Sequence, residues 1–236
     1  MRVVICGGGV VGASIACFLS RRGVGATVVE RTALACAASG KSGGFLAFDW
    51  CDGTPLQNLA RRSFGLHAQL AEEIDADWGF RRLVTYGGLP PAGGLPGRSR
   101  RSHQPDWLSE NVVLDRTLGT TETTAQVLPE KFAAALVRAA EANGATLRIG
   151  NVTGIDEKER KVTGVIVDGE VVPADAIVIA MGPWSVLAAE WLPLPAVYGL
   201  KGHSIIFETG EKIPAEALFL EYEDSDGNGL RERLAD

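Results

Sequence analysis

Residues 2–30 read RVVICGGGVVGASIACFLSRRGVGATVVE, and they contain the strongest indication of the fold in this sequence. Its first five residues form a short, mostly apolar run that ends on glycines, which is typical of a buried parallel strand. From Val10 to Arg22 apolar residues recur at helical spacing, and Ala26–Glu30 predicts a second strand. A strand, a glycine turn, a helix and a second strand make a βαβ unit. The stretch therefore predicts an α/β fold with a parallel sheet.

Each glycine of Gly7-x-Gly9-x-x-Gly12 has its own task in such a unit. Gly7 allows the tight turn out of the strand, Gly9 lets the backbone approach a pyrophosphate, and Gly12 lets the helix pack closely on the sheet. The helix N-terminus offers free N–H groups and the positive end of its dipole to phosphates. Glu30 ends the second strand, where its carboxylate can accept hydrogen bonds from ribose hydroxyls and would repel a 2′-phosphate. The unit predicts dinucleotide binding and disfavours NADP, but it does not separate FAD from NAD.

The composition is that of an ordinary globular protein of 236 residues, with 46% hydrophobic and 22% charged residues and a net charge of −6. No basic stripe dominates, which argues against nucleic acid or an anionic membrane as a partner. The cluster of Arg98, Arg100 and Arg101 lies in a Gly/Pro/Ser-rich stretch and is interpreted as a solvated loop. No transmembrane segment is predicted.

The four cysteines, Cys6, Cys17, Cys36 and Cys51, form no CxxC pair, and no histidine is spaced to complete a zinc site. No metal is therefore predicted. Cys6 and Cys17 fall on the predicted strand and helix and are expected to be buried thiols. The fold begins at Arg2 with no charged and apolar leader before it. These features lead us to expect a cytoplasmic, reducing location.

Two further helices are predicted downstream. The first starts at Pro55 with Thr54 as its cap and has an apolar stripe up to Trp78, and the second runs from Pro129 to Asn143-Gly144. Residues 33–50 predict a loop, and residues 80–125 are less regular, with a mobile loop expected at 91–106. The remaining predicted strands are Thr146–Ile149, Val162–Val167, Glu170–Val172, Asp175–Ala180, Ser204–Phe207 and Ala217–Tyr222.

Two motifs together resemble the D-amino-acid oxidase superfamily of FAD-dependent oxidoreductases, to which glycine oxidase and sarcosine oxidase belong. They are Gly7–Leu19 (GGGVVGASIACFL) and Ala38–Ala47 (ASGKSGGFLA). Three segments support them: Thr121–Pro129 (TETTAQVLP), Ala180–Ser185 (AMGPWS) and Gly199–His203 (GLKGH). The resemblance extends from about residue 1 to about residue 227, and it favours FAD over NAD.

The resemblance implies an elongated FAD and assigns residues to each part of it. The residues facing the pyrophosphate would be Gly7, Gly9, Val10, Val11 and Gly12, and those facing the adenosine ribose would be Glu30 and Arg31. The residues running toward the ribityl chain and flavin would be Ser39, Gly40, Lys41, Ser42, Gly43 and Gly44. Val152 would contact adenine through its backbone, and the nucleotide would be lined by Ala180, Gly182 and Trp184. Packing explains Val152 and Trp184 equally well, and Lys41 also fits a solvated loop.

The implied reaction transfers a hydride from the carbon next to an amine to flavin N5, after which the imine hydrolyses and oxygen reoxidises the flavin. No side-chain base is required, so no catalytic residue is assigned. His67 is expected at the surface or the edge of the long helix and His103 in a loop, while His203 is the histidine placed near the flavin. Four charged residues are candidates for a position near the substrate: Asp115, Arg116, Arg81 and Arg82. Their charge is explained equally well by solvation at the surface.

The expected architecture is a discontinuous, Rossmann-like FAD-binding domain at residues 1–80 and 126–195. An incomplete α+β substrate domain is inserted, at residues 81–125 and 196–236. Residues Asn228–Asp236 depart from the family pattern, and family members continue further. The sequence therefore leads us to expect a C-terminally truncated form that binds FAD weakly, if at all, and is catalytically poor.

Three functions stay open on the sequence alone. The first is an FAD-dependent oxidase of small amines or amino acids, and the second is an NAD-dependent dehydrogenase. The third is a non-catalytic interaction or regulatory protein that keeps the fold. The sequence indicates neither the individual substrate nor the oligomeric state.

Overall fold

A computed structural model describes residues 1–89, 105–109, 112–210 and 213–220 of the chain. The chain divides into two compact units, which are described separately. The first unit comprises Met1–Gly44, Ala68–Phe80 and Val127–Ile205, and the second comprises Phe45–His67, Arg81–Gln126 and Ile206–Asp236. The assignment of residues to an FAD-binding and a substrate domain remains a prediction.

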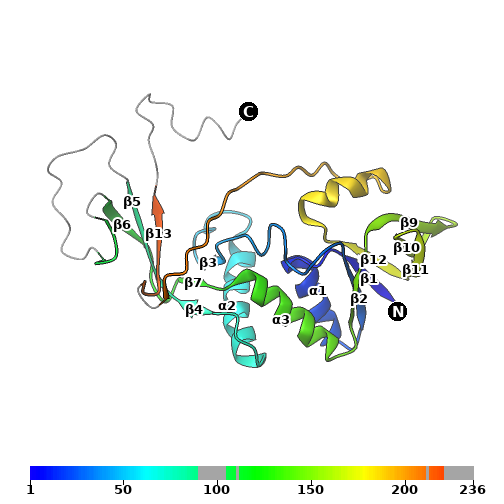
Figure 1. Cartoon of the computed structure of the whole chain (residues 1–236), viewed down its shortest axis with the longest axis horizontal. Coiled ribbons are helices and arrows are strands. Elements are labelled where there is room, and N and C mark those ends of the chain that lie inside the picture. Colours follow the sequence, from blue (N-terminus) through cyan, green and yellow to red (C-terminus); the bar gives the residue numbers. More distant parts are fainter. Residues whose placement is uncertain (90–104, 110–111, 211–212, 221–236) are drawn as a thin grey trace. The chain divides into compact units, whose positions relative to one another are not determined.

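The first unit is built on a four-stranded parallel sheet with the order β12-β1-β2-β8 (Figure 1). Its strands are β1 (Val3–Cys6), β2 (Ala26–Glu30), β8 (Thr146–Ile149) and β12 (Ala176–Ile179). Val3 pairs with Ala26 on one side and with Ala176 on the other. The expected α/β fold with a parallel sheet is confirmed.

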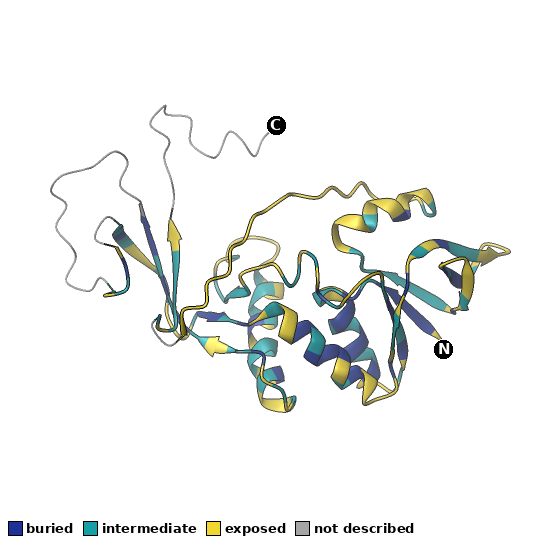
Figure 2. Ribbon diagram, in the orientation of Figure 1, coloured by how far each residue is buried: buried dark blue, intermediate teal, exposed yellow. Residues whose placement is uncertain are grey.

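Alternate residues of β1 point to opposite faces of this sheet, as the two-residue period of a strand requires. Val3 and Ile5 pack with Ala16 and Ala140, which belong to helices α1 (Val10–Ser20) and α3 (Pro129–Glu141). Val4 and Cys6 pack instead toward an antiparallel meander of β9 (Val152–Lys158), β10 (Lys161–Val167) and β11 (Glu170–Pro173). Figure 2 shows β1 and the inner face of α1 buried.

Both cysteines of the βαβ unit are buried, as expected. Burial disfavours a thiolate, so it raises the pKa of Cys6 to about 12 and also raises the pKa of Cys17. Neither thiol is therefore poised to act as a nucleophile at neutral pH.

An ion pair joins the starts of β1 and β12. The Arg2 backbone N–H donates to Asp175 Oδ2 at 2.7 Å, and the Arg2 guanidinium donates to Asp175 Oδ1 at 2.6 Å. These bonds lower the pKa of Asp175 to about 2. The ionised carboxylate therefore stabilises the fold above its ordinary pKa, near pH 4, and this contribution disappears as the pH falls through about 2.

We expect Asp175→Asn to remove this pH dependence. Urea unfolding of the wild type and the variant should be compared at pH 6, 4 and 3. The free energy of unfolding of the wild type should exceed that of the variant at pH 6, and the difference should shrink between pH 4 and pH 2. A difference that stays constant with pH would contradict the assignment.

The second unit contains two three-stranded sheets. One has the order β13-β5-β6, with β13 (Glu216–Leu220), β5 (Val84–Leu89) and β6 (Val113–Gly119). The other has the order β3-β7-β4, with β3 (Phe45–Ala47), β7 (Thr124–Gln126) and β4 (Arg81–Arg82). Most of these strands lie where the sequence predicted irregular structure or a loop, and that expectation was wrong. Glycines, arginines and threonines interrupt the apolar alternation there.

Helix α2 (Gln57–Glu73) is shorter than expected. The hydroxyl of Thr54 accepts the N–H of Leu56 at 3.2 Å, so the chain turns before the helix starts. Leu56 and Leu59, the first two residues of the predicted apolar stripe, are 56% and 68% exposed. Leu56 lies before the first residue of the helix.

The strand predicted at Ser204–Phe207 is not formed. No strand of the described residues pairs with this segment, and Ile205, Ile206 and Phe207 are 76–81% exposed. An extended run needs a neighbouring strand to satisfy its backbone groups, and composition alone could not show whether one is present. A short helix, η1 (Gly182–Glu190), comes earlier in the chain and directly follows β12.

Two sequence expectations fall on residues that the structure does not describe. The cluster of Arg98, Arg100 and Arg101 lies outside the described residues, as do His103 and most of the loop expected at 91–106. Among the described helices, none is both long enough and apolar enough to span a bilayer.

Candidate nucleotide-binding site

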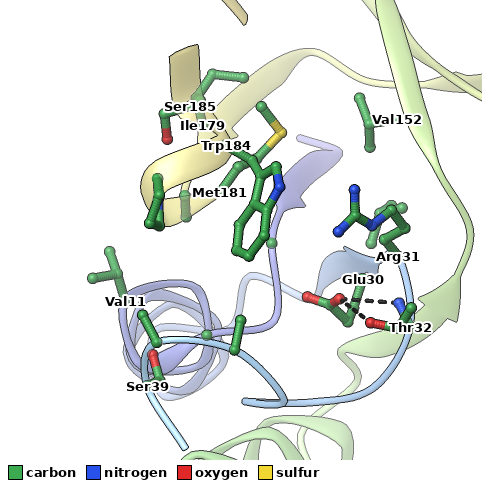
Figure 3. Close-up of a pocket in the computed structure, with 18 of the residues that line it drawn as sticks. Val11, Glu30, Arg31, Thr32, Ser39, Val152, Ile179, Met181, Trp184 and Ser185 are labelled. Atoms are coloured by element: carbon green, nitrogen blue, oxygen red, sulfur yellow. Dashed lines mark hydrogen bonds between the residues drawn. The ribbon is translucent and has the colours of Figure 1, made fainter. Parts of the chain in front are cut away.

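A cleft of about 350 Å³ lies at the carboxyl ends of β1, β2 and β12, and all its lining residues belong to the first unit (Figure 3). Strand β1 is followed in sequence by β2 on one side of it, whereas β12 lies on its other side. The chain therefore reverses its direction of winding at β1. Ligands of open α/β sheets bind in the crevice outside the strand ends at such a switch point.

Two positions, one in the turn after β1 and one in helix α1, accept only glycine. Gly7 has a φ of +115°, and a Cβ there would come 2.3 Å from the carbonyl oxygen of Ala180. A Cβ on Gly12 would come 2.0 Å from the carbonyl oxygen of Gly7. Real side chains do not tolerate such distances, so these glycines let the turn, β12 and helix α1 close on one another.

The N-terminus of α1 opens into the cleft. Gly9 is the N-cap, and no acidic residue lies in the first turn. The N–H of Val10 donates to Ser39 Oγ at 3.0 Å, while the helix itself offers no acceptor for the next N–H groups. A Cβ on Gly9 would come 3.0 Å from Ser39 Oγ, so glycine keeps the space between the helix and Ser39 open. Such a space, lined by N–H groups and the positive end of a dipole, suits a phosphate.

Glu30 ties the end of β2 to the glycine turn. Its Oε2 accepts the N–H of Gly8 at 2.8 Å, and its Oε1 accepts the N–H of Thr32 at 3.0 Å. A carboxylate has about four lone-pair positions, so it retains capacity for hydroxyl donors of a ligand. Figure 3 shows Glu30 beside the cleft, between Thr32 and the indole of Trp184.

Most of the residues predicted to hold a dinucleotide come together here, from five separate segments of the chain. Those lining the cleft are Gly7, Gly9, Val10, Val11, Glu30, Arg31, Ser39, Val152, Ala180, Gly182 and Trp184. Gly12 lies behind the turn and serves the packing. The residues that do not line the cleft are Gly40, Lys41, Ser42, Gly43 and Gly44, and their assignment toward the ribityl chain and flavin stays a prediction.

Sequence reasoning missed several residues of the cleft. They include Thr32, Cys36, Asn151, Met181 and Trp191. Thr32, Asn151 and Met181 each lie within two residues of the end of a strand in this sheet. Cys36 lies three residues before the predicted site residue Ser39. A rule that extends the site from every strand end would have found Thr32 and Met181. Trp191, at the end of η1, gives no such signal.

Ser39 anchors its loop to the helix, and we expect Ser39→Ala to lower the free energy of unfolding by about 0.5–2 kcal/mol, as the loss of a helix cap does. Ser14→Ala is the matched control, because Ser14 lies inside α1, where alanine is favoured. Chemical denaturation should show a loss for the first variant and none for the second. Equal effects of the two substitutions would refute the anchoring role.

The other nominated residues lie elsewhere. Arg81 donates to the side chain of Gln126, Arg82 to the backbone of Glu122, and Arg116 pairs with Asp115, all within the second unit. His67 is half-buried, and desolvation lowers its pKa. His203 is exposed, and its place near the flavin remains a prediction.

Comparison with known proteins identifies the family. The model of the family described as FAD dependent oxidoreductase matches residues 2–233. The chain belongs to this family. It is 29% identical over 254 residues to an oxidoreductase of Schizosaccharomyces pombe, which covers 95% of the chain and 65% of that protein. It is 30% identical over 233 residues to the bifunctional protein ThiO/ThiG of Nostoc sp. (strain PCC 7120), which covers 90% of the chain and 35% of that protein.

Solved structures agree with this family. Glycine oxidase from Bacillus cereus ATCC 14579 superposes with a TM-score of 0.68 and 28% identity, over 80% of this chain and 57% of that one. The chain thus spans less than two thirds of the length of the relatives that it matches.

The residues present fit the cofactor of the family. A single Cβ on Gly9 would narrow the space between the helix and Ser39. The first turn of α1 directs its N–H groups toward this space. Glu30 supplies a carboxylate at the end of β2, and Arg31 supplies a cation at the cleft. FAD, with its pyrophosphate, ribose and adenine, matches these groups, and the family description favours it over NAD.

Proposed function

We propose that the cleft binds the ADP half of FAD, and that the chain serves an FAD-dependent oxidoreductase acting on small amines or amino acids. The observation that carries the proposal is the convergence of the glycine turn, the N-terminus of α1 and Glu30 at one switch point of the sheet. The nature of the substrate rests on the likeness to glycine oxidase.

Each group of the cleft has a defined part in this proposal. The N–H groups of the first turn of α1 hold the pyrophosphate, and Gly9 keeps the backbone within reach of it. Glu30 accepts the ribose hydroxyls while it continues to hold Gly8. Val152 and Ile179 give the cleft apolar walls that exclude water from the nucleotide.

FAD, when bound, supplies the acceptor for a hydride from the carbon that bears the amine, with oxygen as the proposed final acceptor. The role of the described residues is to bind and orient one end of the cofactor. Turnover is proposed for the whole protein, because the chain spans only 65% of the Schizosaccharomyces pombe oxidoreductase and 57% of the Bacillus cereus glycine oxidase. A cytoplasmic location belongs to the same proposal, since all four cysteines are free thiols.

A peroxide-release assay tests the enzymatic part. The purified chain should be loaded with FAD and offered glycine, sarcosine, D-amino acids and small amines. Peroxide that forms only with FAD, and that is lost in Gly9→Ala, would support an oxidase. An FAD-loaded chain that oxidises none of these compounds would contradict oxidase activity of this chain by itself and would favour a non-catalytic binding role for it.

A further inference from the structure

Arg31 and Trp184 form a cation–π pair at the cleft. The guanidinium carbon of Arg31 lies 5.2 Å from the centroid of the Trp184 ring, and both residues line the cleft. Arg31 directly follows β2, and Trp184 lies in η1, which follows β12. Strands β2 and β12 flank β1 on opposite sides, so the pair links the two sides of the site (Figure 3).

The contact between these side chains is one that a ligand can replace. Trp184 is 40% exposed and Arg31 is also exposed. A cation–π contact at a solvated site is weak, because water competes for the cation. Neither side chain is therefore locked in place by the fold.

The pair also has the chemistry that an adenine ring requires. A guanidinium is planar and stacks on aromatic faces. Adenine is a planar ring of greater area, and stacking of a base on an aromatic side chain is stronger than an exposed cation–π contact. The indole face now covered by Arg31 therefore suits adenine, and a displaced Arg31 would remain beside the anionic part of the nucleotide.

We propose that Arg31 covers the indole of Trp184 in the free protein, and that adenine takes its place when the nucleotide binds. Trp184 then recognises the adenine ring, and Arg31 acts as its exchangeable cover. This inference rests on the proposed function, because it takes the ADP half of FAD as the ligand. Simple packing of Trp184 is the competing explanation.

ADP is the probe, because it has the adenine and the pyrophosphate but no redox chemistry. In calorimetric titrations, Trp184→Leu should weaken ADP binding by about 5- to 150-fold, the range that stacking of one base provides. Trp184→Phe keeps a ring face and should restore most of the affinity. Trp50→Leu is the control, because Trp50 is 43% exposed but lies in the second unit, and it should bind ADP like the wild type.

Tryptophan fluorescence gives a second readout of the exchange. The difference between the wild type and Trp184→Phe isolates the emission of Trp184. Acrylamide should quench this emission more strongly in Arg31→Ala than in the wild type, and ADP should bring both to the same protected level.

Two results would overturn the exchange: ADP affinity that is unchanged in Trp184→Leu, or quenching of Trp184 that ADP does not alter. Both leave the proposed function intact, since ADP still binds. A wild-type chain that is folded but binds neither ADP nor FAD would overturn the proposed function and this inference together.

Discussion

Gly12→Ala is expected to destabilise the first unit by about 3 kcal/mol or more, the upper range for an overpacked core. The new Cβ would lie 2.0 Å from the carbonyl oxygen of Gly7 and 3.2 Å from a methyl group of Ile5. The first neighbour is backbone and cannot rotate away, so helix α1 must separate from the turn. In a chain of this size the melting temperature should fall by roughly 6–12 °C, as measured by circular dichroism.

Gly65→Ala is the matched control for this substitution. Gly65 lies inside helix α2, and a Cβ there meets nothing within 4 Å. Alanine should stabilise the helix by about 0.5–1 kcal/mol, because it restricts the unfolded chain. If Gly12→Ala melted at the same temperature as Gly65→Ala, the close packing of the turn on α1 would be refuted.

Gly9→Ala is expected to spare the fold and abolish tight nucleotide binding. The φ of Gly9 is −76°, which alanine adopts without strain, and its Cβ would contact only the movable side chain of Ser39. The same methyl group would occupy the space through which the pyrophosphate reaches the N–H groups of α1. The loss of one or more charge-assisted hydrogen bonds should weaken FAD and ADP binding by at least about 10-fold.

Calorimetry with FAD and with ADP measures this loss, and thermal melting checks that the variant is folded. Gly65→Ala should bind both nucleotides with the affinity of the wild type. Retention of wild-type affinity by a folded Gly9→Ala chain would place the pyrophosphate elsewhere. The two glycines thus separate the demands of packing, at Gly12, from those of the ligand, at Gly9.

The βαβ unit could be predicted because its signals are local. The apolar run before Gly7, the glycine spacing and the carboxylate of Glu30 all lie within one segment. The strands that pair with this unit from distant parts of the chain could not be predicted in the same way. Ala180 follows β12 and Val152 follows β8, and these strands pair with β1 and β2 across more than a hundred residues.

The second unit was predicted less well, for a physical reason. Strands such as Val84–Leu89 and Val113–Gly119 contain glycines and charged residues and are held by pairing rather than by a buried apolar face. At Ser204–Phe207 the opposite error occurred, since the residues favour a strand but have no strand beside them in the described part of the chain. Strand propensity describes how well a residue fits into a sheet, but it does not show whether a neighbouring strand is present.

We propose that one site in the first unit holds the ADP half of FAD. The most direct test is a competition titration of the folded wild-type chain, in which FAD is followed by its fluorescence and displaced by ADP or FMN. We expect one FAD per chain, displacement of FAD by ADP and no displacement by FMN. Displacement by FMN but not by ADP, or no binding of FAD and ADP to the folded chain, would contradict it.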